Sequence, residues 1–156
     1  MKGYKQLLAV VLFGVLLTAC SVDENAADLY KKEPVLDIDI VLPEPIVQNE
    51  PQTYKAVLQQ DGKMVEDAQD VQFTFWKNAD PDQREQVTAR NEGNGIYSAE
   101  KTLEGDGLYF VKVQATANGS TVMPTKQFGV GELTEEEKAA LQNQDEHQHH
   151  GHDAHH

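Results

Sequence analysis

The residues best suited to chemistry are six histidines, and all of them lie in the last ten positions of the chain: His147, His149, His150, His152, His155 and His156. Neutral imidazole is a good ligand for zinc, nickel and copper(II), and histidine-rich tracts are typical of metal-binding segments. Asp145, Glu146 and Asp153 place carboxylate oxygens within reach. The pattern therefore predicts that this tail binds transition-metal ions.

Two other interpretations of the tail stay open. It could be a solvated segment with no metal role, or it could be a purification tag. Tags are usually an unbroken run of six histidines, whereas this tract is interrupted by Gln148, Gly151, Asp153 and Ala154. If a preceding helix extended into the tail, His147 and His150 would share a face. Gly151 opposes such an extension and favours a flexible wrap around the ion.

The rest of the chain shows no catalytic constellation. Between residues 21 and 146 there is neither histidine nor cysteine, so Ser-His-Asp and Cys-His arrangements are excluded there. We therefore expect a protein that is not an enzyme and needs no cofactor to fold. Met64 and Met123 carry thioethers that suit copper(I), but filling gaps in a core is the favoured interpretation of both.

The first twenty residues have the pattern of an export signal. Lys2 and Lys5 precede an apolar run over residues 7–17, which is too short to span a bilayer. The run ends in Leu-Thr-Ala-Cys, which resembles the lipobox of bacterial lipoproteins. The resemblance implies that Cys20 carries a diacylglycerol thioether and becomes the mature N-terminus. An uncleaved membrane anchor is the alternative. We expect a lipid-anchored protein of the cell membrane that faces the extracytoplasmic side.

Charge and length limit the classes of protein to which the chain can belong. Acidic residues outnumber basic residues 26 to 13, which gives a net charge of -13. Binding to nucleic acid, or to an anionic membrane through a basic patch, needs clustered Lys and Arg, so both are excluded. A single cysteine excludes an internal disulfide framework. A chain of 156 residues predicts one domain with tails.

Alternating apolar and polar residues predict an all-β domain. Strands are expected at 36–40, 53–59, 71–75, 86–90, 96–103, 108–117 and 120–130, with a polar loop at 78–82 and turns at 61–62, 93–95, 105–107 and 118–119. About seven short strands favour an immunoglobulin-like antiparallel β-sandwich held by burial alone. The candidate core residues are Leu36, Ile38, Ile40, Leu58, Phe73, Phe75, Tyr97, Tyr109, Val111, Val113 and Phe128.

One short helix is predicted after this domain. Thr134 followed three residues later by Glu137 has the pattern of a capping box, and residues 138–144 continue the helix. Its apolar face is small, so we expect it to fray or project into solvent. The sequence thus predicts four segments. Residues 1–19 form a signal peptide, expected as an N-terminal helix, and residues 20–34 form a lipidated tether with a reach of roughly 20 Å. Residues 35–131 form the β-sandwich, and residues 132–156 form a helix with the His-rich tail.

The predicted domain resembles the YtkA-like domain, which is grouped with FixH-like proteins. The resemblance is carried by Gly95-Ile96-Tyr97-Ser98-Ala99, by Gly107-Leu108-Tyr109-Phe110-Val111, by Pro124 with Phe128-Gly129-Val130, and by the Asp61-Gly62 segment with the strand that follows it. It implies a small exported β-sandwich, often a lipoprotein, without established catalytic residues. The FixH connection implies a link to copper handling or oxidase assembly.

Two functional hypotheses follow. In the first, a lipid-anchored domain binds or buffers zinc, nickel or copper(II) through its tail. In the second, the domain is a protein-interaction module of the cell envelope and its tail has no metal role. The expected partners are the membrane through the lipid anchor, transition-metal ions and an envelope protein, with no nucleic acid.

Overall fold

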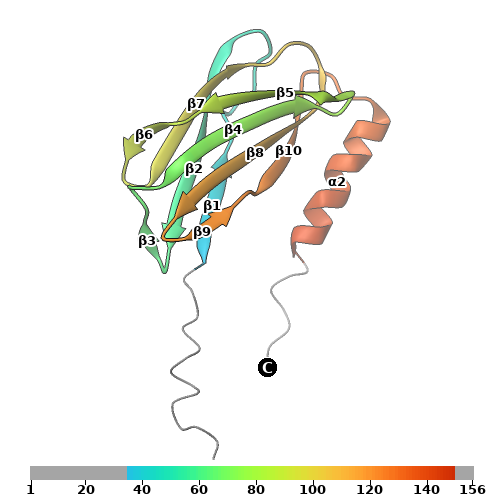
Figure 1. Cartoon of the computed structure of the whole chain (residues 1–156). Coiled ribbons are helices and arrows are strands. Elements are labelled where there is room, and N and C mark those ends of the chain that lie inside the picture. The colour runs from blue at the N-terminus through green and yellow to red at the C-terminus, as the bar shows by residue number, and fades with distance from the viewer. Residues whose placement is uncertain (1–34, 150–156) are drawn as a thin grey trace, which may run out of the picture. The chain divides into compact units, whose positions relative to one another are not determined.

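The computed structural model describes residues 35–149, with side chains through Asn143, and these residues form two antiparallel sheets (Figure 1). The first, the β2 sheet, has the order β1-β2-β7-β6, with β3 paired to β2. The second, the β8 sheet, has the order β10-β8-β4-β5, with β9 paired to β8. The strands are β1 (Leu36–Val41), β2 (Pro51–Gln60), β3 (Lys63–Met64), β4 (Gln69–Lys77), β5 (Asp80–Thr88), β6 (Arg90–Gly93), β7 (Ile96–Thr102), β8 (Gly107–Ala117), β9 (Ser120–Val122) and β10 (Thr125–Val130).

This order confirms the predicted immunoglobulin-like sandwich. In that fold the strands A, B, E and D form one sheet, and C, F and G form the other. Here β1, β2, β7 and β6 correspond to the first set, and β4, β8 and β10 to the second, with β5 as an added neighbour of β4. Tyr109 near the start of β8 completes the likeness, because its hydroxyl donates to the backbone oxygens of Glu104 and Gly105, as in a tyrosine corner.

The structure has more strands than the seven expected, for local reasons. The predicted strand at 86–90 is split, because the chain leaves the β8 sheet after Thr88 and enters the β2 sheet at Arg90. Pro124 interrupts the last predicted strand, since a proline cannot donate to a ladder; β9 and β10 lie on either side of it. The prediction of a loop at 78–82 was wrong, because β5 already begins at Asp80 and includes Pro81.

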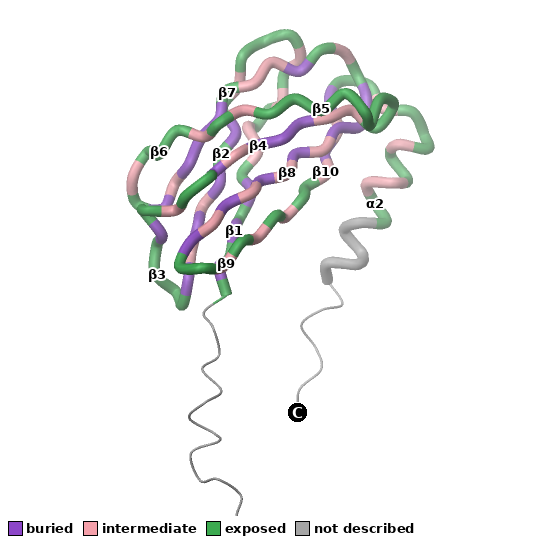
Figure 2. Tube along the Cα trace, in the orientation of Figure 1, coloured by how far each residue is buried: buried purple, intermediate pink, exposed green. Residues whose placement is uncertain are grey.

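The core lies between the two sheets and contains every residue predicted for it (Figure 2). Alternation places one face of each strand inward, as in β1, where Leu36, Ile38 and Ile40 are buried and Asp37 and Asp39 are exposed. Tyr54, Ala56 and Leu58 do the same in β2 and are fully buried. Among the described residues, the core between the sheets extends from Leu36 to Val130.

The interpretation of the two methionines as core residues was wrong. Met64 is 51% exposed and Met123 is 54% exposed. Met64 belongs to the two-residue strand β3, and Met123 precedes the proline that separates β9 from β10, so neither lies on a long alternating strand. Local irregularity therefore turned both thioethers outward.

Helix α2 (Glu135–His149) starts as predicted and is longer than predicted. The capping box is present: Glu137 N donates to Thr134 Oγ1 at 3.3 Å, and Thr134 N donates to Glu137 Oε2 at 2.9 Å. The helix passes Gln144, where it was expected to end, and continues to His149. It lies beside β10 (Figure 1).

Candidate functional site

The structure tests only part of the site predicted from sequence. Cys20 and the predicted signal helix lie outside the described residues, as do His150, His152, His155 and His156. The backbone of helix α2 includes His147 and His149, whose side chains are not described. Among the described residues, no group of three or more His, Cys, Asp or Glu side chains is placed to hold a metal ion. Within the same residues, no helix is long and apolar enough to cross a membrane.

Helix α2, which leads into the tail, is fastened to the sandwich through Glu137. One carboxylate oxygen of Glu137 accepts from Leu108 N in β8 at 3.1 Å, while the other accepts from Thr134 N and Oγ1, both at 2.9 Å. The hydrogen bonds from Thr134, then that from Leu108, and finally the positive charge of Lys77 lower the pKa of the Glu137 carboxyl. The first turn of the helix is therefore docked and does not project freely.

A small apolar contact supports the same joint from the outer side of the β8 sheet. Leu108 is buried, yet its place in β8 directs it away from the core between the sheets. Its partner across the ladder, Gly129, lies under Leu133, since a Cβ added there would come within 2.6 Å of Leu133 Cδ1. The glycine thus leaves room for the segment that leads into helix α2.

Beyond this joint, the outer face of the β8 sheet is a regular grid of side chains from four strands. The strand registers place Trp76 beside Phe110 and Gln127, then Thr74 beside Lys112, Thr125 and Gln86, and then Gln72 beside Gln114 and Thr88. Arg84 extends the first row, because its guanidinium lies 4.8 Å from the centre of the Trp76 ring. These three rows contain two cations and no carboxylate.

An aromatic stack marks one end of this grid. The rings of Trp76 and Phe110 are 5.2 Å apart between centroids and inclined by 5°. Stacked aromatic pairs and a cation over a tryptophan ring are each favourable contacts. No ion pair among the described residues involves Arg84 or Lys112. Sequence reasoning missed this surface, because its residues come from β4, β5, β8 and β10 and become neighbours only through the register.

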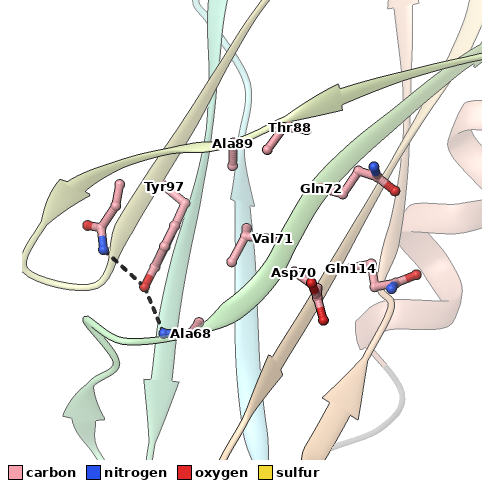
Figure 3. Close-up of a pocket in the computed structure, with 9 residues that line it drawn as sticks. Ala68, Asp70, Val71, Gln72, Thr88, Ala89, Tyr97 and Gln114 are labelled. Carbon is pink, nitrogen blue, oxygen red and sulfur yellow. Dashed lines mark hydrogen bonds between the residues drawn. The ribbon is translucent and has the colours of Figure 1, made fainter.

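A shallow depression lies at the start of β4, beside β5 and β6 (Figure 3). Tyr97 forms part of its wall, and its hydroxyl accepts from Ala68 N at 3.0 Å and from Asn91 Nδ2 at 3.3 Å. Burial raises the pKa of Tyr97, partly offset by the hydrogen bond from Ala68. Asp70 is the only ionisable residue besides this tyrosine in the wall. The hydrogen bonds of Tyr97 therefore hold neighbouring strands together, and the residues that line the depression include no set of metal ligands or acid–base groups.

A second depression lies between the two sheets near the end of β4. Lys101 of β7 pairs with Glu85 of β5 at 2.5 Å and so links the sheets across their open side. Lys77 Nζ lies 5.6 Å from the centre of the Tyr109 ring. Burial is the main cause that raises the pKa of Tyr109, followed by the charge of Glu104. The wall thus carries both lysines and carboxylates, and its Lys101–Glu85 pair joins one sheet to the other.

Comparison with known proteins identifies the family of this sandwich. The YtkA-like family matches residues 30–114, which is more than half of the chain. The protein belongs to the YtkA-like family. The match ends inside β8, so β9, β10 and helix α2 of this YtkA-like protein lie beyond the matched residues.

Solved structures similar to this YtkA-like protein are distant. A single-substitution variant of superoxide reductase (neelaredoxin) from Ignicoccus hospitalis is 12% identical with a TM-score of 0.43, covering 70% of this chain and 92% of that one. The same protein without a stated substitution is 10% identical with a TM-score of 0.39, covering 62% and 80%. This level of similarity does not bear on function. No curated protein matches the chain.

Proposed function

We propose that this YtkA-like protein is a non-enzymatic, lipid-anchored protein on the extracytoplasmic side of the membrane that binds zinc, nickel or copper(II) through its histidine-rich tail. The observation that carries the proposal is the segregation of all six histidines into residues 147–156. The described domain contains no cluster of metal-ligating side chains. In this proposal the sandwich serves as the scaffold and the tail binds the metal ion.

The docked helix supports this arrangement. Glu137 and Leu133 fix the first turn of helix α2 to the β8 sheet, so the start of the segment that leads to the histidines has a defined position. Several imidazoles in a short stretch can then converge on one ion. The histidine ligands must be neutral to bind, which makes the affinity dependent on pH.

The anchor in the proposal is Cys20, for which the lipobox pattern of residues 17–20 is the support. Removal of the signal would also remove Lys2 and Lys5, leaving 11 basic against 26 acidic residues. An acidic protein held near a membrane raises the local concentration of cations around it. Anchor and charge would therefore serve the same task of collecting metal ions close to the membrane.

Calorimetric titration with zinc tests the proposal. The protein spanning residues 21–156 should bind zinc at pH 7 and lose affinity over roughly pH 7 to 5, because free histidine has a pKa of about 6.5. A chain ending after Asp145 should lose most of the binding. A matched variant with all six histidines replaced by glutamine keeps the length of the tail and should also fail to bind.

The alternative function, an envelope interaction module without a metal role, predicts a different result. Equal zinc binding by the intact and shortened chains would contradict the proposal and direct attention to the exposed Met64 and Met123. Zinc affinity in the micromolar range that survives the glutamine replacements would do the same. The melting temperature without metal should be equal in all three proteins, since the core lies within residues 36–130.

A further inference from the structure

The chain contains two Asn-Gly pairs, and each forms a turn between antiparallel strands: Asn94-Gly95 joins β6 to β7, and Asn118-Gly119 joins β8 to β9. We propose that Asn118 is a site of spontaneous deamidation and that the fold protects Asn94 from the same reaction. The reaction needs water and no metal ion, so it can be tested independently of the proposed function.

An Asn-Gly pair is labile because the glycine has no side chain to hinder attack by its own backbone nitrogen. At this site Gly119 N loses its proton and bonds to Asn118 Cγ. The bond from Cγ to Nδ2 breaks, and Nδ2 leaves with that proton as ammonia. Water then opens the cyclic imide. Opening at Cγ gives aspartate, and opening at the main-chain carbonyl gives isoaspartate; each product carries a new carboxylate.

The local conformation does not distinguish the two pairs. Asn94 and Asn118 have φ angles of 52° and 48°, and the glycines after them have φ angles of 72° and 81°. Such angles are typical of a two-residue hairpin turn. In either pair the backbone must turn before the glycine nitrogen can reach Cγ. The difference in reactivity therefore depends on how firmly the surroundings hold each turn.

Gly95 is buried and held by the neighbouring strands. Its carbonyl oxygen accepts from Leu58 N at 2.8 Å. A Cβ added to Gly95 would come within 2.8 Å of Leu58 O and 3.0 Å of Met64 Cβ, so β2 and β3 lie directly against this turn. Movement of the turn breaks the hydrogen bond and opens the packing. That local opening costs free energy, which slows the reaction at Asn94.

The turn at Asn118-Gly119 has the opposite surroundings. Both residues are exposed, and a Cβ added to Gly119 would have no neighbour within 4 Å (Figure 2). The turn leads into β9, a strand of three residues that pairs with β8. The Asn118 side chain is restrained by one hydrogen bond, from its Nδ2 to Gln60 Oε1 at 2.6 Å. An exposed turn beside a short strand opens at low cost, so the reaction falls on Asn118.

Deamidation of Asn118 also removes a contact between the sheets. Its Nδ2 is both the donor to Gln60, on the opposite sheet, and the atom that leaves, so this hydrogen bond ends with the reaction. Isoaspartate adds one atom to the main chain, whereas the pairing of Ala117 with Ser120 leaves room for a turn of two ordinary residues. We therefore expect β9 to detach from β8 in the isoaspartate form.

Peptide mapping by mass spectrometry measures the reaction at both sites in one sample. The protein spanning residues 21–156 is incubated at pH 8 and 37 °C and cleaved with trypsin, which separates residues 113–126 from residues 91–101. The exchange of NH2 for OH should appear about tenfold faster at Asn118 than at Asn94, a ratio equivalent to about 1.4 kcal/mol. In guanidinium chloride that unfolds the protein, the two rates should become similar.

A pair of variants tests the restraint on the Asn118 side chain. Gln60→Met removes the acceptor of its hydrogen bond and should accelerate the reaction at Asn118 without changing the rate at Asn94. Gln59→Met, at the neighbouring position of β2, is the matched control and should leave both rates unchanged. An equal rate at Asn118 in the two variants would contradict the role of the bond to Gln60.

Equal rates at Asn94 and Asn118 in the folded protein would overturn the proposal. So would a folded protein that stays unmodified at Asn118 while the unfolded protein reacts at both sites. Hydrogen exchange of the isoaspartate form tests the effect on the fold: the amides of Ser120–Val122 should lose protection, and those of Thr125–Val130 should keep it. Unchanged protection of β9 would contradict its detachment.

Discussion

The hydroxyl of Tyr54 offers a sharp test of the packing, because removing it should stabilise the protein. Tyr54 is fully buried, and its hydroxyl has no hydrogen-bond partner among the described residues. Its ring packs against Phe75, with 4.9 Å between centroids, and against Phe128. A buried polar group without a partner costs about 1–3 kcal/mol. Tyr54→Phe keeps the ring and removes that cost, so the free energy of unfolding should rise by about that amount.

Two other tyrosines provide matched controls for this substitution. The hydroxyl of Tyr97 accepts from Ala68 N, and that of Tyr109 donates to two backbone oxygens. Tyr97→Phe and Tyr109→Phe should each lower the free energy of unfolding, by about 0.5–1.5 kcal/mol for the lost bond. Urea denaturation and thermal melting measure all three variants. Each kcal/mol should shift the melting temperature by roughly 4–8 °C in a domain of this size.

Alkaline unfolding provides a second test of the buried Tyr54 hydroxyl. Burial raises the pKa of Tyr54 to about 12, and the neighbouring Tyr109 contributes to the shift. The folded state thus disfavours ionisation that the unfolded chain undergoes near pH 10. The contribution of the neutral Tyr54 hydroxyl to the free energy of unfolding is therefore fully present below about pH 10 and is lost as the pH rises towards about 12. The advantage of Tyr54→Phe should therefore grow over that interval.

The reasoning about Tyr54 would be refuted by a destabilised Tyr54→Phe variant. A loss as large as that of Tyr97→Phe would mean that the Tyr54 hydroxyl has a hydrogen-bond partner in solution. An unchanged difference between Tyr54→Phe and the parent from pH 9 to pH 12 would contradict the raised pKa. Neither result could be attributed to the ring, because phenylalanine preserves its volume and its aromatic contacts.

Three further predictions concern the helix, the core and the anchor. Thr134→Ala should lower the stability of helix α2 by about 1 kcal/mol. Because the pKa of Glu137 is lowered from its ordinary value of 4.5, the docking of the helix should be complete above about pH 4.5 and should be lost as the pH falls through the pKa of Glu137 in the folded protein. Proteolysis of the helix as a function of pH measures both effects, and cleavage that is independent of pH would contradict the role of Glu137. Phe73→Ala should cost about 3–5 kcal/mol of a typical 5–15 kcal/mol, and an unchanged melting temperature would show that its burial does not stabilise the sandwich. Cys20→Ala should leave an unprocessed precursor that incorporates no labelled fatty acid, so normal labelling of that variant would exclude Cys20 as the lipidation site.

The inward face of the sandwich could be predicted from the sequence because it depends on a local rule. Side chains alternate across a strand, so Leu36, Ile38 and Ile40 must share a face wherever the strand lies. The turn at Asn118-Gly119 is equally local, and both residues have the positive φ angles that such a turn requires. The capping box at Thr134 involves atoms only three residues apart. Each of these predictions was confirmed for that reason.

Other features of the fold depend on which strands become neighbours, and there sequence reasoning failed or was silent. The change of sheet at Ala89 leaves the local alternation almost uninterrupted, so a single strand was expected where two exist. The exposure of Met64 and Met123 follows from a two-residue strand and a proline break that hydropathy does not reveal.

By itself, the sequence determined the period-two pattern, the turns, the acidic balance and the collection of histidines at one end. Only the tertiary structure decided that Arg84, Trp76 and Phe110 form one stack, that Glu137 reaches Leu108 N, and that the Tyr54 hydroxyl is buried without a partner among the described residues. The physical reason is the range of the interactions. Alternation and capping act over a few bonds of the backbone, whereas a stack across three strands or an orphaned hydroxyl is created by the register and packing of segments that are distant along the chain.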